Sequence, residues 1–570
     1  MKDIEWIFAE ENHELAGEIS RKFGISLITA QLLINRGCDD FDKAMKFMNE
    51  DESSFFAPTL MCDMKKAVKR TIEACRNGEK ILIFGDYDVD GTSSVVMLIK
   101  TLRAIGCKCN YYIPRRLKEG YGLNCDVVKT AASEGYTLLI TADCGTSNLE
   151  EISLAGECGI EVIVLDHHLP SEQMPDAFAI VNPKRPDCTY PFKDLSASGI
   201  VYKFCSEILA GDHFPELMEE LLGLAAMGTV ADIAPLCGEN RAIVKKGLQI
   251  LNRTSNPGLN ALLERRELLH KKIMPWHISF VLAPVINAEG RVHKYSENEP
   301  DGISEVVELF VSNDKKSLDR YVAMLCEDND KRQEIEKSIV AEAKNMIERR
   351  AVSKDMPGYV FYNAQWHPGV IGVVASKLSE ELRKPVFIIG EGGRGSARSS
   401  ISFDIYSAVK NCSEMMLSFG GHRHAAGFRM EPSLVEDFTD EINKYCASVL
   451  KEDDFIKKEY VDINVELSQL GPDIVNEIDM LEPFGYGNPQ PVFCSSPVYS
   501  GNSPRIVGTD HLKAVFNQGN TEIQAIAFKM ANKKSLLDRN LPLSIIYTPQ
   551  FNEWDGEKRI QLKIKDIKAL

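Results

Sequence analysis

The sequence lacks the features of an exported or membrane-spanning chain. Its N-terminal segment is acidic and amphipathic, whereas a signal peptide begins with basic residues and continues with an apolar core. The longest apolar stretch, residues 221–236, contains Asp232 and is too short to span a bilayer, which needs about 20 apolar residues. We therefore expect a cytoplasmic location and no action at a membrane.

The sequence also lacks any cysteine pair of the C-x-x-C kind. Its 15 cysteines are an odd number and lie scattered along the chain. They match neither the spacing of a zinc site nor a disulfide framework. Reduced and mostly buried thiols are therefore expected.

Positive charge is scarce relative to negative charge. The chain has 66 Lys and Arg against 83 Asp and Glu, which gives a net charge of −17 at pH 7. Because binding to nucleic acid depends on Lys and Arg near the phosphates, this balance argues mildly against tight non-specific binding. It does not exclude a nucleic-acid substrate, since carboxylates gathered around cations are acidic and a basic groove can lie beside them.

The chain is long enough for several domains. Its 570 residues exceed a typical domain of roughly 100–200 residues. Short apolar runs alternate with helical segments in the first half, which indicates βαβ units and a mostly parallel sheet. The predicted division is an N-terminal helical segment packing on the first lobe (1–75), a first α/β lobe (76–313), a connector helix (314–350), a second α/β lobe (351–450) and an all-β, OB-like domain (451–570).

Three predicted strands lead directly into acids or histidines. The side chains concerned are Asp86, Asp88 and Asp90 after residues 81–84, Asp143 after residues 138–141, and Asp166, His167 and His168 after residues 162–165. In an open parallel sheet, ligands bind beyond the carboxyl ends of the strands. We therefore expect these side chains to converge on one crevice.

Clustered carboxylates point to bound cations. Carboxylates brought together raise one another's pKa values, and a pair of divalent ions removes that cost. Carboxylate with some imidazole suits Mn²⁺ or Mg²⁺, whereas thiolate suits zinc. Any single one of these acids could instead cap a helix or shape a turn. A calcium loop starting at Asp86 is a poor fit, because the glutamate needed at loop position 12 falls on Met97.

The ordered motifs resemble those of the DHH phosphoesterase superfamily. They are GDYDVDGT, TADCG, LDHH and GTVADIAPL, followed by FGGHRHAAGF at residues 419–428, which looks like the signature of a DHH-associated domain. Three further blocks, IPRRLKEGYGL, YPFKDLSASG and INAEGR, are similar to those of RecJ-type single-stranded-DNA-specific exonucleases. The resemblance covers nearly the whole chain.

This resemblance implies a single-stranded-DNA-specific exonuclease that degrades 5′→3′ by two-metal-ion hydrolysis and serves DNA recombination and repair. It makes residues 76–313 the catalytic domain, 351–450 the substrate-binding domain and 451–570 a nucleic-acid-binding domain. The implied ligands of two Mn²⁺ or Mg²⁺ ions are Asp88, Asp90, Asp143, His167 and Asp232, with Asp86 as a weaker candidate. Asp143 would bridge the ions, and His168 would lie near the scissile phosphate. Asp232 follows Gly228, which we expect to end a helix.

Basic residues form the second candidate constellation. Arg115 and Arg116 precede a Gly-Tyr-Gly turn, and residues 391–400 read as a glycine-rich loop that contains Arg398. Backbone N–H groups in such a loop can form an anion site, and arginine binds phosphate bidentately, although a solvated flexible loop is the alternative. By resemblance, Arg116, Ser396 and Arg398 hold a terminal 5′ phosphate, Arg291 and Asn287 lie near the cut, and His422 contacts the substrate.

The sequence departs from the RecJ-type pattern at two positions. Val285 stands where an arginine is usual, and Glu289 stands where a small residue is usual. An acid beside the DNA channel predicts a weaker grip on the substrate. The implied partner is single-stranded DNA with a 5′ end, with a single-strand-binding protein or helicase added by resemblance alone, and we expect a monomer.

Two alternative functions remain open from the sequence. The same metal centre could act on short oligoribonucleotides, cyclic dinucleotides or pyrophosphate, although the chain length and the extra β domain argue against so small a substrate. A non-catalytic DNA-binding scaffold should have lost its metal ligands, whereas this sequence retains every candidate ligand.

Overall fold

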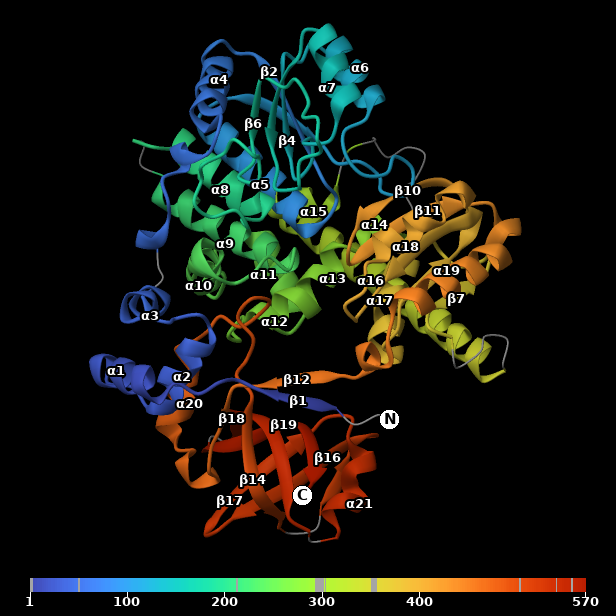
Figure 1. Ribbon diagram of the computed structural model, residues 1–570. Helices are drawn as coiled ribbons and strands as arrows, with labels where there is room; N and C mark the ends of the chain where they lie inside the picture. The colour runs from blue at the N-terminus through green and yellow to red at the C-terminus, as the bar shows by residue number, and fades with distance from the viewer. Residues whose placement is uncertain are drawn as a thin grey trace. The chain divides into compact units, whose positions relative to one another are not determined.

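The computed structural model describes residues 4–49, 52–211, 214–292, 302, 304–349, 356–501, 504–539, 541–554 and 557–570 (Figure 1). The chain divides into two compact units. Unit 1 comprises Met1–Phe55, Pro235–Ala242 and Ile456–Leu570, and unit 2 comprises Phe56–Ala234 and Ile243–Phe455. The predicted boundary at residues 350 and 351 lies outside the described residues.

Unit 2 begins with a five-stranded parallel sheet, which confirms the predicted βαβ pattern. The strand order is β3-β2-β4-β5-β6, with β2 at Lys80–Gly85, β3 at Lys108–Tyr112, β4 at Leu138–Ala142, β5 at Glu161–Leu165 and β6 at Ala179–Val181. The central strand β4 is buried throughout, as expected for apolar runs covered on both faces.

Helices cover both faces of this sheet. Their bounds are α4 Met64–Arg76, α5 Val89–Ala104, α6 Cys125–Ser133, α7 Leu149–Glu157, α8 Ala197–Ile208 and α9 Pro215–Ala231. Helices α6 and α7 pack against one face, where Val128 and Ile152 meet Leu82 and Val162. Helices α4, α5 and α8 lie on the other side of the sheet (Figure 1). The carboxyl ends of the strands therefore open between two helical layers.

A run of short helices leads to the predicted connector. It comprises α10 Gly238–Leu251, α11 Pro257–Arg265, α12 Pro275–His277, the π-helical turn η3 Ile278–Leu282, α13 Ala283–Ile286, α14 Glu289–Val292 and α15 Glu305–Val311. The connector helix α16 spans Lys315–Glu348, with Asp314 as its N-cap. Leu318, Val322 and Leu325 of this helix are buried, so this part of α16 packs against neighbouring helices such as α11 and α15.

The second lobe of unit 2 holds a mixed sheet of order β10-β11-β9-β8-β7. Its strands are β7 Tyr359–Tyr362, β8 Val386–Ile389, β9 Arg394–Arg398, β10 Met416–His422 and β11 Ala425–Met430, and its main helices are α17 Ile371–Leu382, α18 Ile405–Asn411 and α19 Val435–Val449. The expected glycine-rich loop at residues 391–400 is wrong in part. Residues 394–398 form β9, because they pair with β8 and β11 on either side.

Unit 1 holds a seven-stranded sheet of order β13-β14-β18-β19-β17-β16-β15, closed by pairing of β14 with β16. The strands are β13 Ile463–Asn464, β14 Phe493–Ser500, β15 Arg505–Val507, β16 His511–Gln518, β17 Thr521–Ala527, β18 Leu543–Trp554 and β19 Glu557–Ala569, with helices α20 Pro472–Asp479 and α21 Lys534–Leu537. This closed sheet agrees with the predicted all-β domain. A separate two-stranded parallel pair joins β1, Glu5–Phe8, to β12, Lys458–Val461.

The N-terminal helices differ from the expectation that residues 1–75 pack on the first lobe. Helices α1 His13–Phe23, α2 Leu27–Asn35 and α3 Phe41–Met48 belong to unit 1. Ile19 and Leu33 share a buried core with Phe493 and Leu562 of the β domain. Only the last part of the range, with α4, lies in unit 2. An apolar helix face can be found from sequence, but its partner surface cannot.

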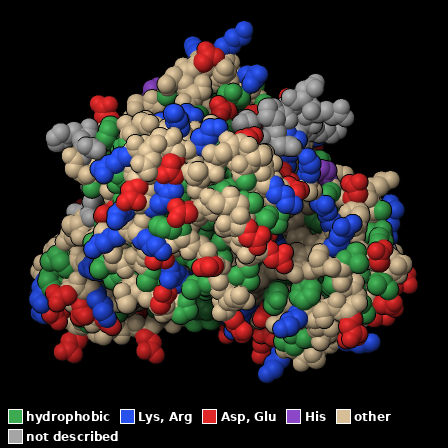
Figure 2. All heavy atoms as spheres, turned by 90° about the horizontal axis from the view of Figure 1, so that it is seen from above, with side chains coloured by type: hydrophobic (Ala, Val, Ile, Leu, Met, Phe, Trp, Pro, Cys, Tyr) green, Lys and Arg blue, Asp and Glu red, His purple; other side chains and the backbone are tan. Residues whose placement is uncertain are grey.

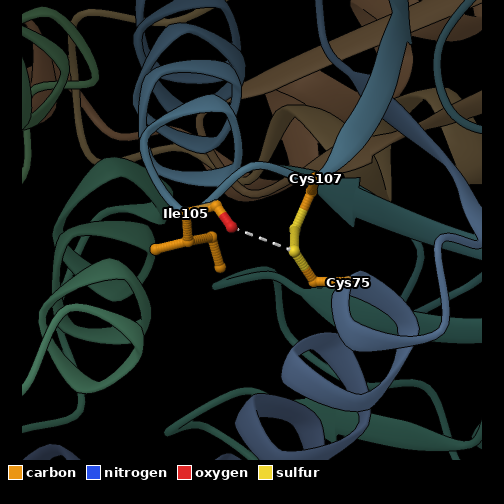
Figure 3. Close-up of a disulfide and its surroundings, with 3 residues drawn as sticks. All are labelled: Cys75, Ile105 and Cys107. Carbon is orange, nitrogen blue, oxygen red and sulfur yellow. Dashed lines mark hydrogen bonds between the residues drawn. A yellow bond between two sulfur atoms is a disulfide. The ribbon is translucent and has the colours of Figure 1, made fainter.

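Two cysteines form a disulfide that the sequence did not predict. Cys75 at the end of α4 is bonded to Cys107 before β3, with a Cα–Cα distance of 4.7 Å, and Cys75 Sγ lies 3.3 Å from the carbonyl oxygen of Ile105 (Figure 3). The expectation of reduced thiols is wrong for this pair, whereas the described residues contain no second disulfide. A separation of 32 residues matches no short motif, so only the approach of the end of α4 to the residue before β3 reveals the bond.

Charges of both signs share the molecular surface. On the face drawn in Figure 2, Lys and Arg side chains are interspersed with Asp and Glu. The negative net charge therefore leaves room for local basic sites. Among the described residues, no helix has both the length and the apolar character needed to cross a membrane.

Candidate metal centre and phosphate-binding residues

The predicted metal ligands meet at the carboxyl ends of three adjacent strands. Asp86 follows β2, Asp143 follows β4, and His167 follows β5, and these strands are neighbours in the sheet. Asp232 joins them as the C-cap of α9. Gly228, expected to end this helix, lies inside it, because α9 continues to Ala231.

The structure groups these side chains into three sets, in each of which the potential ligand atoms lie within 4.8 Å of one another. The sets are Asp86, Asp88 and Asp143; Asp90, His167 and Asp232; and Asp143, His167 and His168. His167 Nε2 lies 3.2 Å from Asp143 Oδ1, and His167 Nδ1 lies 3.8 Å from Asp232 Oδ2. Asp143 and His167 each belong to two sets, so the cluster can serve two neighbouring ions.

Two carboxylate oxygens in the cluster lack hydrogen bonds and indicate whether cations would fit there. Oδ1 of Asp86 and Oδ1 of Asp143 are buried and accept no hydrogen bond. Leaving such oxygens without a partner is costly, and a divalent cation would satisfy both. The donor set is carboxylate with imidazole, which suits Mn²⁺ or Mg²⁺. The residues present therefore fit the metal pair that the sequence predicted.

Backbone N–H groups orient the acids that follow β2. Asp88 is the N-cap of α5, and its Oδ1 accepts from the N–H groups of Asp90 and Gly91 at 2.9 and 3.0 Å. Asp90 accepts from the N–H groups of Ala197 and Ser198, at 2.8 and 2.9 Å, where α8 begins. A Cβ at Gly228 would collide with Asp90 Oδ1 and Ser198 Oγ. The N-termini of α5 and α8 thus hold Asp88 and Asp90 in place. Helix α9 can approach Asp90 and Ser198 this closely only because residue 228 is glycine.

The electrostatics of the cluster are those of crowded carboxylates. Burial, followed by the charges of Asp88 and Asp90, raises the pKa of Asp143 well above its usual range. Burial and the same two neighbours raise the pKa of Asp232 to about 8. Burial lowers the pKa of His167 to about 4, which keeps the imidazole neutral. Cations bound among these groups would favour the ionised carboxylates and the neutral imidazole.

Two further residues, Asp166 and Tyr121, orient the site; the sequence interpretation placed Asp166 at a strand end without giving it a role, and gave none to Tyr121. Asp166 is 1% exposed; its Oδ1 lies 2.7 Å from His168 Nδ1 and accepts from the N–H of His167 at 2.7 Å. Despite the opposing effect of burial, the bond to Asp166 raises the pKa of His168. The hydroxyl of Tyr121 donates to the carbonyl oxygen of Asp143 at 2.9 Å and lies 3.2 Å from His168 Nδ1. The sequence signals that could have identified these two residues were the aspartate of the DHH tripeptide and the tyrosine of the Gly-Tyr-Gly turn.

Three arginines gather beside the metal cluster. Burial, followed by the charge of Arg116, lowers the pKa values of Arg291 and Arg398 to about 10 in both cases. Arg116 also interacts with the buried carboxyl of Asp86, so Arg116 lies within electrostatic reach of the cluster, and Arg291 and Arg398 lie within reach of Arg116. Arg398 Nη1 donates to Ser396 Oγ at 3.1 Å, which places this serine beside the guanidinium group. Clustered guanidinium groups favour a phosphate ligand.

The remaining residues predicted to contact the substrate, Asn287, His422 and Arg115, lie in different environments. Asn287 has a buried Oδ1 that accepts no hydrogen bond. His422 ends β10; burial, then His424 and Arg398, lower its pKa. The backbone N–H of Arg115 donates to Glu119 Oε1 at 2.9 Å, which fixes the chain before Arg116.

Three family models match successive parts of the chain. The DHH family N-terminal domain matches residues 80–229, the DHHA1 domain matches residues 355–448 and the RecJ OB domain matches residues 461–566. Together with the parallel sheet and its cluster of acids and histidines, these matches define a protein of the DHH phosphoesterase class.

Similarity to individual proteins narrows the class. The single-stranded-DNA-specific exonuclease RecJ of Bacillus subtilis (strain 168) is 33% identical, over 99% of this chain and 70% of that protein. The chain belongs to the RecJ family, as its motifs predicted. The crystal structure of RecJ from Thermus thermophilus in complex with Mn²⁺ is 27% identical and matches 100% of this chain and 80% of its own, with a TM-score of 0.84. The crystal structure of the same protein in complex with Mg²⁺ is 26% identical in sequence. The match covers 99% of this chain and 78% of that chain, with a TM-score of 0.78.

Proposed function

We propose that this chain is a divalent-metal-dependent exodeoxyribonuclease that degrades single-stranded DNA in the 5′→3′ direction. The observation that carries the proposal is the convergence of carboxylates and histidines from three strand ends and α9 on one cluster, with Arg116 close enough to interact with Asp86 and with Arg291 and Arg398. The B. subtilis relative is named as a single-stranded-DNA-specific exonuclease, which supports the same substrate here. The expected role is in DNA recombination and repair.

The residues proposed to hold two Mn²⁺ or Mg²⁺ ions are Asp86, Asp88, Asp90, Asp143, His167 and Asp232. Asp143 belongs to two of the ligand sets, which supports its role as the bridging ligand. The unsatisfied Oδ1 of Asp86 supports a direct rather than an indirect role for this acid. Two such ions, when bound, supply an activated water and offset charge on the phosphoryl oxygens.

The chain's own side chains would position the phosphodiester for in-line attack. Arg291 would offset the negative charge that develops at the phosphate being cut. His168, tied to Asp166, would present its ring to the same phosphate. Arg116, Ser396 and Arg398 would hold the terminal 5′ phosphate, and Arg115, Asn287 and His422 would contact the adjoining backbone. Capture of a 5′ phosphate beside the metal cluster gives the direction of degradation.

The test uses a DNA strand with a 5′ phosphate and a 3′ fluorophore, incubated with Mn²⁺, beside the same strand in a blunt duplex. We expect a ladder of shortening 3′-labelled products from the single strand alone. Asp143→Asn should abolish it, because the proposed bridging carboxylate is lost. The matched control is Asp126→Asn, an exposed acid in the first turn of α6, which should cut at the wild-type rate.

Other outcomes would favour the alternatives. If the long strand stayed intact while dinucleotides or cyclic dinucleotides were hydrolysed, the substrate of the metal centre would be a small molecule and not single-stranded DNA. Inertness toward both, together with no tight Mn²⁺ binding by calorimetry, would leave a DNA-binding scaffold. A single-strand-binding protein or helicase partner, the monomeric state and the cytoplasmic location stay predictions.

A further inference from the structure

Glu289, one of the two departures from the RecJ-type pattern, does not lie where the sequence suggested. It was expected to add negative charge beside the DNA channel. In the structure Glu289 is only 5% exposed, and its carboxylate points into the protein toward the start of α15. The other departure, Val285, is 0% exposed. The interpretation that these positions weaken the grip on DNA by facing the channel is therefore not supported by their burial.

The carboxylate of Glu289 meets three donors where α15 begins. Oε2 accepts from Ser304 Oγ at 3.0 Å and from the N–H of Val306 at 3.2 Å. Oε1 accepts from the N–H of Glu305 at 3.2 Å. The first N–H groups of a helix have no partner within it. Glu289 therefore caps a helix that starts 16 positions further along the chain.

Glu289 and Arg291 share the four-residue helix α14. So short a helix cannot hold its own conformation in water, because nucleation is unfavourable and few bonds repay it. Helix α14 packs closely against its surroundings, since a Cβ at Gly369 would collide with the carbonyl oxygen of Arg291, and Val292 is buried in a core with Ile339 of α16. Arg291 Nη1 also lies 3.4 Å from the carbonyl oxygen of Gly369. The bonds of Glu289 add a further support, which joins this turn to α15.

Helix α15 is itself firmly placed in the catalytic lobe. Glu308 on α15 accepts a hydrogen bond from the Tyr111 hydroxyl on β3 at 2.7 Å. The same helix packs against α5, which begins directly after Asp88 and contains Asp90. A continuous set of contacts thus runs from the metal cluster through α5 and α15 to Glu289.

We propose that Glu289 is a positioning residue that holds Arg291 at the phosphate being cut, by tying α14 to the start of α15. The proposal rests on the role given to Arg291 under the proposed function. A small residue at this position offers no acceptor for the three donors, so this chain fixes the turn by a contact that the usual pattern lacks. Burial, followed by Glu305, raises the pKa of Glu289 well above its usual range. A glutamine can place its amide oxygen where Oε2 accepts from Ser304 and Val306, but its amide nitrogen cannot accept from the N–H of Glu305, so it replaces the carboxyl group only in part.

The test compares Glu289→Ala, Glu289→Gln and Glu477→Ala in the metal-loaded enzyme. We expect Glu289→Ala to lower kcat on the order of 10-fold, with KM changed less than about twofold, because a misplaced group loses rate rather than ground-state binding. Glu289→Gln should restore part of the rate, because its amide oxygen can still accept from Ser304 Oγ and the N–H of Val306. Glu477→Ala is the matched control: Glu477 likewise accepts from the hydroxyl and the N–H of a helix N-cap, Ser26, but it lies in unit 1, so kcat should stay near wild type at a comparable loss of Tm.

A double-mutant cycle with Arg291→Ala separates positioning from general stability. Once Arg291 is absent, Glu289→Ala should lower kcat no further. Full additivity, or an equal loss in Glu477→Ala, would overturn the proposal. Hydrogen exchange of residues 286–292 gives a readout independent of turnover: Glu289→Ala should speed it more than Glu289→Gln does, and unchanged exchange in Glu289→Ala would also overturn the proposal. Wild-type enzyme that leaves single-stranded DNA intact would refute the proposed function, while the exchange result would still decide the structural claim.

Discussion

Arg398 is the residue whose loss should separate recognition of the strand end from cleavage. Its guanidinium group lies beside Ser396 and within electrostatic reach of Arg116, but it belongs to none of the metal-ligand sets. A charge-assisted hydrogen bond contributes about 1.5–3 kcal/mol. Arg398→Ala should therefore raise KM roughly 10- to 100-fold for a 5′-phosphorylated strand and leave a 5′-hydroxyl strand nearly unaffected.

The measurement is the ratio of kcat/KM between the two strands. Arg429→Ala is the matched control, because Arg429 is an exposed arginine on the neighbouring strand β11 and should leave the ratio unchanged. Equal losses on both strands in Arg398→Ala would place Arg398 in general DNA binding and not in recognition of the 5′ end.

The carboxylates predict a pH dependence of stability in the metal-free protein. The pKa of Asp232 is raised to about 8, so the folded state binds a proton that the unfolded state releases above about pH 4. Stability from this group is therefore present at low pH and falls as pH rises from roughly 4 to 8. After chelation, we expect a lower Tm at pH 8 than at pH 6.

Added Mn²⁺ should raise Tm at both pH values and more at pH 8, because the ligands bind in their deprotonated forms. Asp232→Asn should shrink the difference between the two pH values in the chelated protein. A chelated wild-type protein with the same Tm at pH 6 and pH 8 would contradict the assigned electrostatics of the cluster.

Single residues also show the limit of motif reading. Asp143 and His167 were found because strand ends of a parallel sheet share one edge, so sequence position alone predicts their proximity. Asp166 and Tyr121 act through hydrogen bonds to His168 and to the backbone of Asp143. Such bonds depend on side-chain direction, which neither strand position nor composition specifies.

At the scale of elements, the pairing of α2 with the β domain makes a testable difference. Leu33 is 0% exposed and lies in the core shared with Phe493 and Leu562. Truncation of such a side chain costs about 2–5 kcal/mol. Leu33→Ala should therefore lower the free energy of unfolding of unit 1 by about that amount in urea denaturation.

The matched control is Leu27→Ala on the same helix, because Leu27 is 60% exposed and its loss should change stability by less than about 0.5 kcal/mol. Mn²⁺ affinity should stay unchanged in both variants, since every proposed ligand belongs to unit 2. Equal small effects of the two substitutions would contradict the shared core.

Two other elements show why local patterns mislead. Residues 394–398 look like a flexible loop because they contain glycine, yet they form β9 by pairing with strands on both sides. Glu289 looks like a channel residue because its neighbours in the motif are expected to contact the substrate, yet its carboxylate caps α15. In each case a long-range partner decides the conformation.

At the scale of the whole molecule, the net charge of −17 sums acidic and basic sites that have different functions. The metal cluster concentrates acids at strand ends, whereas Arg116, which interacts with Asp86, and the two arginines within its reach, Arg291 and Arg398, supply local positive charge. The net charge of the whole chain cannot distinguish the acidic metal cluster from the nearby arginines, so it is a weak guide to the substrate of a metal-dependent nuclease.

The sequence by itself determined the family, the parallel sheet, the connector helix and the acids and histidines that meet at the strand ends. These follow from local periodicity and from motif order, both of which are written along the chain. Tertiary structure alone decided that the N-terminal helices share a core with the β domain, that Cys75 meets Cys107, and that Glu289 supports Arg291. Each of these depends on which surfaces meet after folding, and burial and hydrogen bonding between distant segments leave no periodic trace in sequence.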